Sequence, residues 1–429
     1  MKLLIKGGRI INPALNMDIA GDILITDGCI AEIGQKIDGA GAEIFDATGY
    51  IVAPGLVDMH VHLREPGLEA KEDIYSGTRA AAAGGFTTIA CMPNTKPVVD
   101  SSIAVSGIIQ RAQNEGVVRV RAIGALSKGQ EGKELAEIGD MVAAGAVALS
   151  DDGHYVSSAR LFQAGLLYAN MFDKVVISHA EEESLVEDGH MHEGAISAML
   201  GMRSRPAVAE DIAVMRDVML AEYTGARLHI AHVSSANAVE FIRQAKKRGV
   251  KVTAEATPHH LTLTDEAVIG FDTATKVNPP LRSADHVQAL IQGLNDGTID
   301  AIATDHAPHA AEEKDMEYIY APSGFAGLET SVGVILTSLY HTGQCTLPQI
   351  LEKMTIGPAR ILGGEAGVLQ PGAAADITLI DPDREWVVDE TTFYTKGKKT
   401  PFSGQKLKGK AVAVFVAGEL IMKNGEVLK

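Results

Sequence analysis

Side chains that bind divalent metal ions follow several short apolar runs of this sequence. They are His60, His62, Asp152, His179, His232 and Asp305. Imidazole and carboxylate groups are donors that zinc and similar divalent ions take in catalytic sites. Two such ions about 3.5–4 Å apart can polarise a substrate and activate water, and a carboxylate can bridge them. Asp151 and Asp152 are both placed for that bridge, so the residue types predict metal-assisted hydrolysis.

The spacing in Asp58-Met-His-Val-His62 supports this interpretation. Residues two apart in a strand point to the same side, so His60 and His62 can face one site. A single His or Asp at a strand end is more often a hydrogen-bonded structural group than a ligand. Ligand-type residues at the ends of five separate apolar runs are much harder to explain in that way.

The other histidines receive structural interpretations. We expect His259 and His260 to have structural or supporting roles, and His306 to point away from the metal ligands. Surface, loop or core positions are expected for His154, His190, His192, His229, His286 and His341. Asp58 and Asp73 could orient imidazoles, and a purely structural role fits them equally well.

The elements that must position these ligands alternate in type. Eight apolar runs predict strands: GLVDMHVH, GFTTIACMPN, VVRVRAIGAL, GAVALSDDG, KVVISHAE, RLHIAHVS, KVTAEATPH and IDAIATDH. Amphipathic stretches lie between most of them, which is typical of a (β/α)8 barrel of the TIM type over residues 51–363. The carboxyl ends of barrel strands converge on one mouth, so the predicted ligands would meet there.

Both ends of the chain have a different pattern. Residues 1–50 and 364–429 show the short alternation of strands, with turn signals such as Asp27-Gly28. We expect these ends to pack together as one small β-sandwich domain beside the barrel.

Composition narrows the choice of partners. The 429 residues carry a formal net charge of −17, which argues against nucleic acid or an anionic membrane as partner. The three cysteines are far apart and suggest neither a disulfide framework nor a thiolate zinc site. No apolar stretch approaches the ~18 residues of a membrane span, and the first residues lack signal-peptide features, so we expect a cytoplasmic protein.

The motifs resemble those of the amidohydrolase superfamily, and within it the bacterial type-I dihydroorotases. The strongest pieces are DMHVHLREPG at 58–67 and ATDHAPH at 303–309, supported by MPNT at 92–95, KVNPP at 276–280 and APSG at 321–324. The resemblance covers nearly the whole chain. Hydantoinases and allantoinases carry a carbamylated lysine on the fourth barrel strand, whereas the run at 145–152 here has no lysine.

The resemblance implies zinc as cofactor, with one or two ions per chain and two favoured. The first ion would be held by His60, His62 and Asp305. The second would be held by His179 and His232, with Asp152 preferred to Asp151 as the bridge.

The resemblance also implies a substrate that carries a carboxylate. The implied binding residues are His62, Arg64, Asn94, Asn278, His309, Ser323 and Gly324. Arg64 lies two residues beyond His62, and its planar guanidinium suits bidentate binding of a carboxylate. Asn94 and His309 would share that anion, while Asn278 and the backbone at 323–324 would hold ring amides. Without the motif, a surface ion pair of Arg64 with Glu65 or Glu69 is an equally good interpretation.

The implied reaction is the reversible cyclisation of N-carbamoyl-L-aspartate to (S)-dihydroorotate in de novo UMP synthesis, with Asp305 as general acid and base. One alternative is a hydantoinase- or allantoinase-like cyclic amidohydrolase. Another is a catalytically silent scaffold homologue, for which broken ligands would be expected. A homodimer and an association with aspartate carbamoyltransferase stay open. Glu312, Glu313 and Lys314 are expected to form a solvated helix start.

Overall fold

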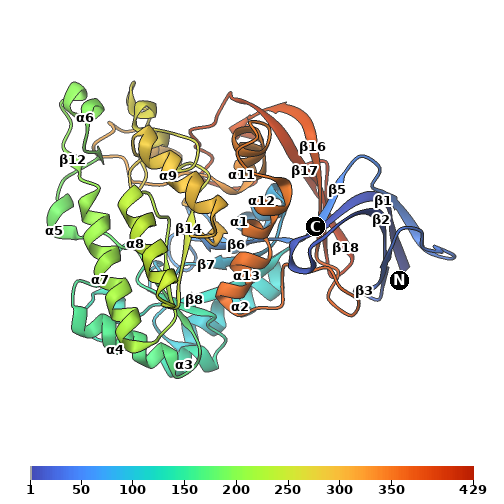
Figure 1. The fold of residues 1–429 in the computed structure, drawn as a ribbon, viewed down its shortest axis with the longest axis horizontal. Helices are drawn as coiled ribbons and strands as arrows, with labels where there is room; N and C mark the ends of the chain where they lie inside the picture. Colours follow the sequence, from blue (N-terminus) through green and yellow to red (C-terminus); the bar gives the residue numbers. More distant parts are fainter. Residues whose placement is uncertain (1) are drawn as a thin grey trace.

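The computed structural model describes residues 2–429, and its larger part is a parallel barrel (Figure 1). The barrel strands, in spatial and chain order, are β6 (Leu56–Val61), β7 (Phe86–Cys91), β8 (Arg119–Gly124), β9 (Ala148–Ser150), β10 (Val175–Ser178), β13 (Leu228–Ile230), β14 (Val252–Ala256) and β15 (Ala301–Ile302). The ring closes because Val61 pairs in parallel with His306, and the amide of His62 donates to the carbonyl of His306 at 2.8 Å. The eight-stranded barrel expected from the apolar runs is therefore confirmed.

Helices cover the outside of the barrel. They are α1 (Ile74–Gly84), α2 (Ser102–Glu115), α3 (Ile138–Ala143), α4 (Ala159–Asn170), α7 (Val208–Thr224), α8 (Ala236–Lys247), α9 (Ala284–Asn295), α11 (Ser331–Ile335), α12 (Leu347–Met354) and α13 (Ile356–Leu362). The short helix α10 (Ala311–Lys314) lies in the connection that follows β15. Several helices begin at a side chain that accepts an amide hydrogen bond of the first turn, including Asp73, Ser101, Ser158 and Ser235. Between β10 and α7 the chain makes an excursion with α5 (Glu183–Val186), β11 (Met191–His192), α6 (Ala195–Leu200) and β12 (Ser204–Arg205).

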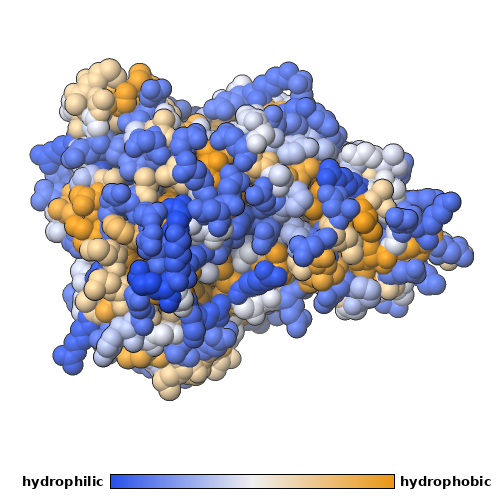
Figure 2. Space-filling model, viewed as in Figure 1, coloured by the Kyte–Doolittle hydropathy of each residue, from blue (hydrophilic) through white to orange (hydrophobic). Residues whose placement is uncertain are grey.

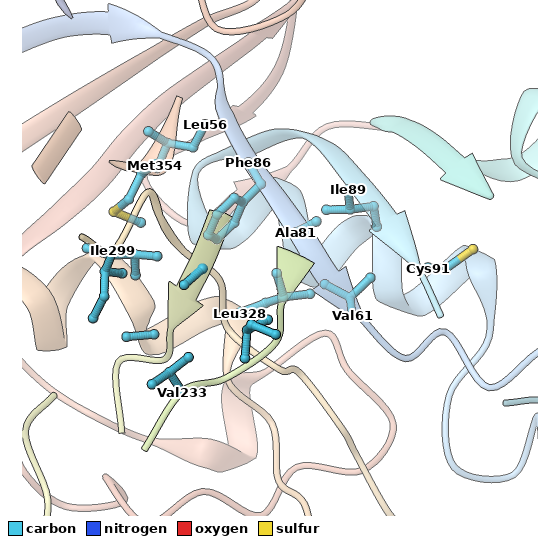
Figure 3. Close-up of a cluster of buried hydrophobic side chains, with 14 of the residues drawn as sticks. Leu56, Val61, Ala81, Phe86, Ile89, Cys91, Val233, Ile299, Leu328 and Met354 are labelled. Atoms are coloured by element: carbon cyan, nitrogen blue, oxygen red, sulfur yellow. The ribbon is translucent and has the colours of Figure 1, made fainter. Parts of the chain in front are cut away.

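Apolar side chains from strands and helices fill the space between the two layers. Figure 3 shows Leu56 and Phe86 from the first two barrel strands beside Ile299, Leu328 and Met354 from the last third of the chain. All five are buried, and each such side chain stabilises the fold by about 1.5–3 kcal/mol relative to exposure. This packing holds the strand ends, and with them the polar side chains of the mouth, in fixed positions.

The two chain ends form one nine-stranded sheet beside the barrel. Its strands are β1 (Lys2–Asn12), β2 (Met17–Thr26), β3 (Cys29–Gly34), β4 (Glu43–Asp46), β5 (Ile51–Pro54), β16 (Ile377–Val387), β17 (Lys406–Val416), β18 (Glu419–Lys423) and β19 (Glu426–Val427). Phe45 of β4 meets Phe415 of β17 edge to face, with ring centroids 5.3 Å apart, so the sheet wraps around a shared apolar core. The strand-rich unit expected from both ends is therefore confirmed.

The junction between the two units lies in one extended segment. β5 pairs with β1 and β16 in the terminal sheet, and the chain enters β6 of the barrel two residues later. The division into residues 1–50 with 364–429 and 51–363 stays a prediction, since β5 itself belongs to the terminal sheet. Within residues 2–429, no helix is long and apolar enough to cross a membrane.

Candidate metal centre and substrate pocket

The mouth of the barrel brings together the expected ligands that follow its first, fourth and eighth strands. Nε2 of His60 lies 3.3 Å from Oδ1 of Asp152 and 3.5 Å from Oδ1 of Asp305. Nε2 of His62 lies 3.1 Å from the same oxygen of Asp305 and 3.5 Å from Oδ2 of Asp152. These donor atoms therefore surround one small volume, as expected for His60 in β6 and His62 just after its end.

The fifth and sixth strands supply a second set of donors. Nδ1 of His179 lies 2.9 Å from Nε2 of His232, and each of these nitrogens is 3.7 Å from Oδ1 of Asp152. Donor atoms around one tetrahedral zinc ion are roughly 3.3 Å apart, because Zn–N and Zn–O bonds are about 2.0–2.2 Å long. Asp152 is thus the carboxylate shared by the two sets.

Unpaired atoms at this place fit metal binding. Nε2 of His60 and Oδ1 of Asp152 are buried and have no hydrogen-bond partner among the described residues. Buried polar atoms are almost always paired, so a nitrogen and an oxygen that face each other without partners fit a site for a cation between them. Two overlapping groups have geometry suited to an ion: His60, Asp152 and His232, and His60, His62 and Asp305.

Neighbouring side chains fix which ring nitrogen faces the centre. Nδ1 of His62 donates to Oδ1 of Asn94 at 2.8 Å, and Nδ1 of His60 donates to Oε1 of Glu255 at 2.6 Å. In both rings Nε2 therefore faces the carboxylates of Asp152 and Asp305, which is how carboxylates and amides orient ligand imidazoles.

Glu255 was missed by the sequence analysis. It lies on β14 fully buried, and it also contacts Nε2 of His229 at 3.1 Å. Burial alone would raise the pKa of this carboxyl, but His60 and His229 bring it down to about 2. The available signal was an acidic residue inside the apolar run KVTAEATPH, where an unpaired charge is costly.

Asp58 and Asp73 bind groups other than the expected ligand imidazoles. The carboxylate of Asp58 accepts the amides of His60 and Thr304, and therefore ties the end of β6 to the end of β15. Asp73 caps α1 through the amide of Ser76. Their structural interpretation is the one that fits these contacts.

Adjacent Asp151 and Asp152 have different surroundings. Oδ1 of Asp151 accepts the amides of Leu126 and Ser127 at 2.8 and 2.9 Å, and Oδ2 accepts the hydroxyl of Ser127. These bonds turn its carboxylate toward the preceding loop. Asp152 alone faces the histidines.

Backbone conformation is unusual around the centre. Arg64, His232 and Asp305 have φ values of 61°, 32° and 48°. Left-handed backbone at residues other than glycine costs of order 1–3 kcal/mol and persists only where the surroundings enforce it. The surrounding fold thus holds these three residues in a backbone conformation that they would not adopt on their own.

A cavity of about 230 Å³ opens beside the donors. It is lined by His62, Arg64, Asn94, Asp152, Gly153, His179, His232, Asn278, Asp305, Ala307, His309, Ser323 and Gly324. All seven residues expected to bind substrate therefore line one pocket with the donors, although their roles stay predictions.

Arg64 reaches this pocket without a carboxylate partner among the described residues. Its Nε donates to the carbonyl of Pro308 at 3.2 Å, and its Nη2 lies 3.4 Å from Nε2 of His309. Glu65 pairs instead with Arg111, and Glu69 accepts the amide of Gly67. The alternative of a surface ion pair for Arg64 is therefore wrong, because the residue is only 9% exposed and those carboxylates are engaged elsewhere.

His309 is held in a defined protonation state. Its Nε2 donates to the carbonyl of Ser323 at 2.8 Å, and its Nδ1 accepts from Nζ of Lys71 at 3.3 Å. Burial, then the positive charges of Arg64 and Lys71, lower the pKa of His309 to about 2, so this imidazole is neutral.

The groups expected to hold ring amides are already engaged within the protein. Nδ2 of Asn278 lies 3.1 Å from Nε2 of His179, and its Oδ1 accepts from Arg205 at 2.7 Å. The amide of Gly324 donates to the carbonyl of Lys276 at 2.9 Å. A ring amide would bind to the remaining lone pairs or displace one of these contacts.

Three further histidines occupy structural positions. Nε2 of His306 lies 3.2 Å from Glu72, on the side away from the donors, and His260 contacts Thr257 and the carbonyl of Pro279. His259 is buried beside His260, and burial lowers its pKa to about 3. These contacts agree with the interpretations drawn from the sequence.

Comparisons with known proteins agree with this geometry. The family described as Dihydro-orotase-like matches residues 49–238. A dihydroorotase of Pelotomaculum thermopropionicum is 56% identical over 424 residues, which are 99% of this chain and 99% of that protein. A dihydroorotase of Pelobacter propionicus is 53% identical over 99% of this chain and all of the relative.

The chain belongs to the dihydroorotase family.

Among solved structures, the chain is similar to L-hydantoinase (dihydropyrimidinase) from Arthrobacter aurescens. The TM-score is 0.91 at 29% identity, covering all of this chain and 97% of that one. Fold and metal-dependent cyclic amide chemistry are thus shared with the hydantoinases. The much higher identity to dihydroorotases does not favour the hydantoinase alternative, and β9 of this chain has no lysine. The intact donor set speaks against a silent scaffold.

Proposed function

We propose that this dihydroorotase family member interconverts N-carbamoyl-L-aspartate and (S)-dihydroorotate in pyrimidine biosynthesis. The observation that carries the proposal is Arg64, which is buried at the cavity lined by five of the six expected metal ligands and has no ion-pair partner among the described residues. Both reaction partners bear a carboxylate that such a fork can bind in a bidentate manner. Hydantoin lacks this group and would leave Arg64 unpaired.

We further propose two zinc ions as the resident metals. His60, His62 and Asp305 would hold one, His179 and His232 would hold the other, and Asp152 would bridge them. When bound, zinc lowers the pKa of water and polarises a carbonyl oxygen. The residue types and the orphaned atoms of His60 and Asp152 support this assignment.

Proton transfer is assigned to Asp305. Its carboxylate lines the cavity, 3.1 Å from Nε2 of His62. In the hydrolytic direction it accepts the proton of the attacking water and delivers it to the leaving ring nitrogen. In ring closure the same carboxylate works in the opposite sense. Arg64, Asn94 and His309 hold the substrate carboxylate meanwhile.

The direct test compares dihydroorotate, hydantoin and allantoin at equal enzyme concentration. We expect turnover of dihydroorotate and of N-carbamoyl-L-aspartate in the reverse direction. Ring opening is followed by loss of ultraviolet absorbance and by chromatography of the product. Turnover of hydantoin with none of dihydroorotate would refute the proposal.

Arg64→Met is expected to raise KM for dihydroorotate by about 10- to 100-fold, because a charge-assisted hydrogen-bonded pair is lost. The effect on kcat should be smaller, because Arg64 binds the same carboxylate in the ground state and the transition state. Steady-state kinetics measure both constants. Arg79→Met is the control, because Arg79 is a partly exposed arginine of α1 that binds the carbonyls of Tyr75 and Glu115 and does not line the pocket. An unchanged KM in Arg64→Met would contradict the assigned role.

A homodimer is also proposed, with α7 as the contact between two copies. Its outward side carries Val208, Ile212, Met215, Met219 and Tyr223, which are 40–77% exposed. Spacings of four, three, four and four residues place them on one face of the helix. Hydrophobic side chains gather on the left of Figure 2, where α7 lies in Figure 1.

The absence of charge on these five side chains favours a second copy of the chain as the partner that binds this face of α7. A two-fold axis places the same patch against itself, so any charge there would face its own copy. None of the five side chains is charged, although the chain has a net charge of −17. Sedimentation equilibrium should give a dimer for the wild type and for Met199→Glu, an equally exposed control on α6, and a monomer for Met219→Glu. A monomeric wild type would contradict this proposal.

Cytoplasmic location and an association with aspartate carbamoyltransferase complete the proposal. Cys29, Cys91 and Cys345 are free thiols, which fits a reducing compartment. Co-purification with the transferase from the native cells tests the association.

A further inference from the structure

Two lysines are buried under the loop that borders the substrate pocket. This loop, residues 315–327, joins α10 to the short 3-10 turn Leu328–Thr330 and carries Ser323 and Gly324 into the cavity. Lys314 is only 2% exposed and Lys276 only 7% exposed. The expectation of a solvated helix start is therefore wrong for Lys314, because the loop folds back over its side chain.

Lys314 binds the part of the loop that faces the pocket. Its Nζ donates to the carbonyl of Pro322 at 2.9 Å and to the carbonyl of Gly324 at 2.8 Å. These two carbonyls flank Ser323, whose own carbonyl accepts from His309. The ammonium therefore fixes both sides of the residue that contacts the anion-binding imidazole.

Lys276 binds the beginning of the same loop. Its Nζ donates to the carbonyls of Tyr318 and Ile319, both at 2.9 Å. Its own carbonyl accepts the amide of Gly324. Side chain and backbone of Lys276 thus contact the loop at two points.

Neither ammonium has a carboxylate within 4 Å among the described residues. Both Nζ atoms donate to loop carbonyls alone. Burial, then the neighbouring Lys276, lower the pKa of Lys314 to about 7, while Asp272 and Glu313 act in the opposite direction from farther away. Burying a charge without a counter-ion costs free energy, so other interactions of these two lysines must offset that cost.

The interactions that offset the cost of burying the two lysines are their hydrogen bonds to carbonyls of the loop. Its backbone forms no helix or strand between Ala321 and Gly327, so carbonyls there lack regular partners. Two of them, at Pro322 and Gly324, accept from Lys314, and two earlier carbonyls of the loop, at Tyr318 and Ile319, accept from Lys276. Gly324 has a φ of 120°, which favours glycine, and a Cβ there would lie 2.5 Å from the carbonyl oxygen of Ala307. The turn therefore requires glycine and is tightly packed.

We propose that Lys314 and Lys276 are positioning residues that hold the loop at 318–324 in the shape required to bind substrate. They touch neither substrate nor metal donors; they act through the backbone of Ser323 and Gly324. The inference rests on the proposed function, since the loop is taken as part of the dihydroorotate pocket.

The test compares Lys314→Met, Lys276→Met, the double variant and a control. Methionine keeps the apolar volume and removes the donors. Lys353→Met is the matched control, because Lys353 is a buried lysine on α12, away from this loop. We expect each loop variant to raise KM for dihydroorotate about tenfold with a smaller change in kcat, and with zinc content unchanged. The double variant should show less than the sum of the two free-energy effects, because both lysines hold one loop.

Amide hydrogen exchange provides a measurement that needs no activity. Exchange over residues 318–327 should accelerate in both loop variants and stay at the wild-type rate in Lys353→Met. Wild-type KM and wild-type exchange in Lys314→Met would overturn the inference while leaving the proposed function intact. Global unfolding of both loop variants beside a folded control would also overturn it, because the lysines would then support the whole fold. If the wild type failed to turn over dihydroorotate, the proposed function would fall, and exchange would still report on the loop.

Discussion

Asp305→Asn is expected to lower kcat for dihydroorotate by about 10²–10⁴-fold, the range that a positioned general acid or base contributes. The substitution keeps the shape of the side chain and removes its ability to accept and return a proton. Asp305 lies 3.1 Å from Nε2 of His62, and among the described residues Asp152 is the one other carboxylate that lines the pocket. Steady-state kinetics in both directions measure the loss, and thermal unfolding should show a folded protein.

Asp300→Asn is the control for this experiment. Asp300 immediately precedes the same strand at its opposite end, where it binds the amide of Ala254 and Nζ of Lys246. Its activity should stay close to that of the wild type. Because Asp305 is also an expected ligand, zinc content is measured in parallel. Loss of zinc in proportion to activity would show that Asp305 acts as a ligand alone, and near-normal kcat in Asp305→Asn would refute the proton-transfer role.

The positions that the sequence predicted well are those governed by local periodicity. Alternation in a strand places His60 and His62 on one side, and barrel geometry brings the ends of separate strands to one mouth. His179, His232 and Asp305 follow from the same rule, because each directly ends an apolar run. The positions of these residues can be predicted from the residues next to them in the sequence, without contacts between distant parts of the chain.

Positions governed by long-range contacts were harder to predict. Asp151 and Asp152 are neighbours of the same type, and the difference between them arises from Ser127, 24 residues earlier in the chain. Lys314 follows Glu312 and Glu313, which is the pattern of a solvated helix end, and only the returning loop buries it. Glu255 is marked by its place in an apolar strand, but its partner His60 is 195 residues away.

Asp152→Asn is expected to reduce bound zinc from about two ions per chain to about one or fewer, and to lower turnover by on the order of 10³-fold. The carboxylate of Asp152 is the only one that approaches both donor sets among the described residues, at 3.3 Å from His60 and 3.7 Å from both His179 and His232. An asparagine amide is neutral, so it leaves the positive charge of two adjacent ions uncompensated. Elemental analysis after purification without chelator gives the zinc content independently of activity.

Asp151→Asn is the control that removes the neighbouring carboxylate. It shows whether the zinc loss in Asp152→Asn comes from the bridging role or from removing either carboxylate of this turn. The carboxylate of Asp151 accepts hydrogen bonds from two backbone amides and one hydroxyl. Asparagine in its place should therefore lower the free energy of unfolding by about 1–3 kcal/mol. Zinc content should stay at the wild-type level, because Asp151 turns away from the histidines. The opposite result, with zinc lost from Asp151→Asn and kept in Asp152→Asn, would transfer the bridge to Asp151. Equal zinc content in both variants would mean that neither carboxylate is required to join the two donor sets.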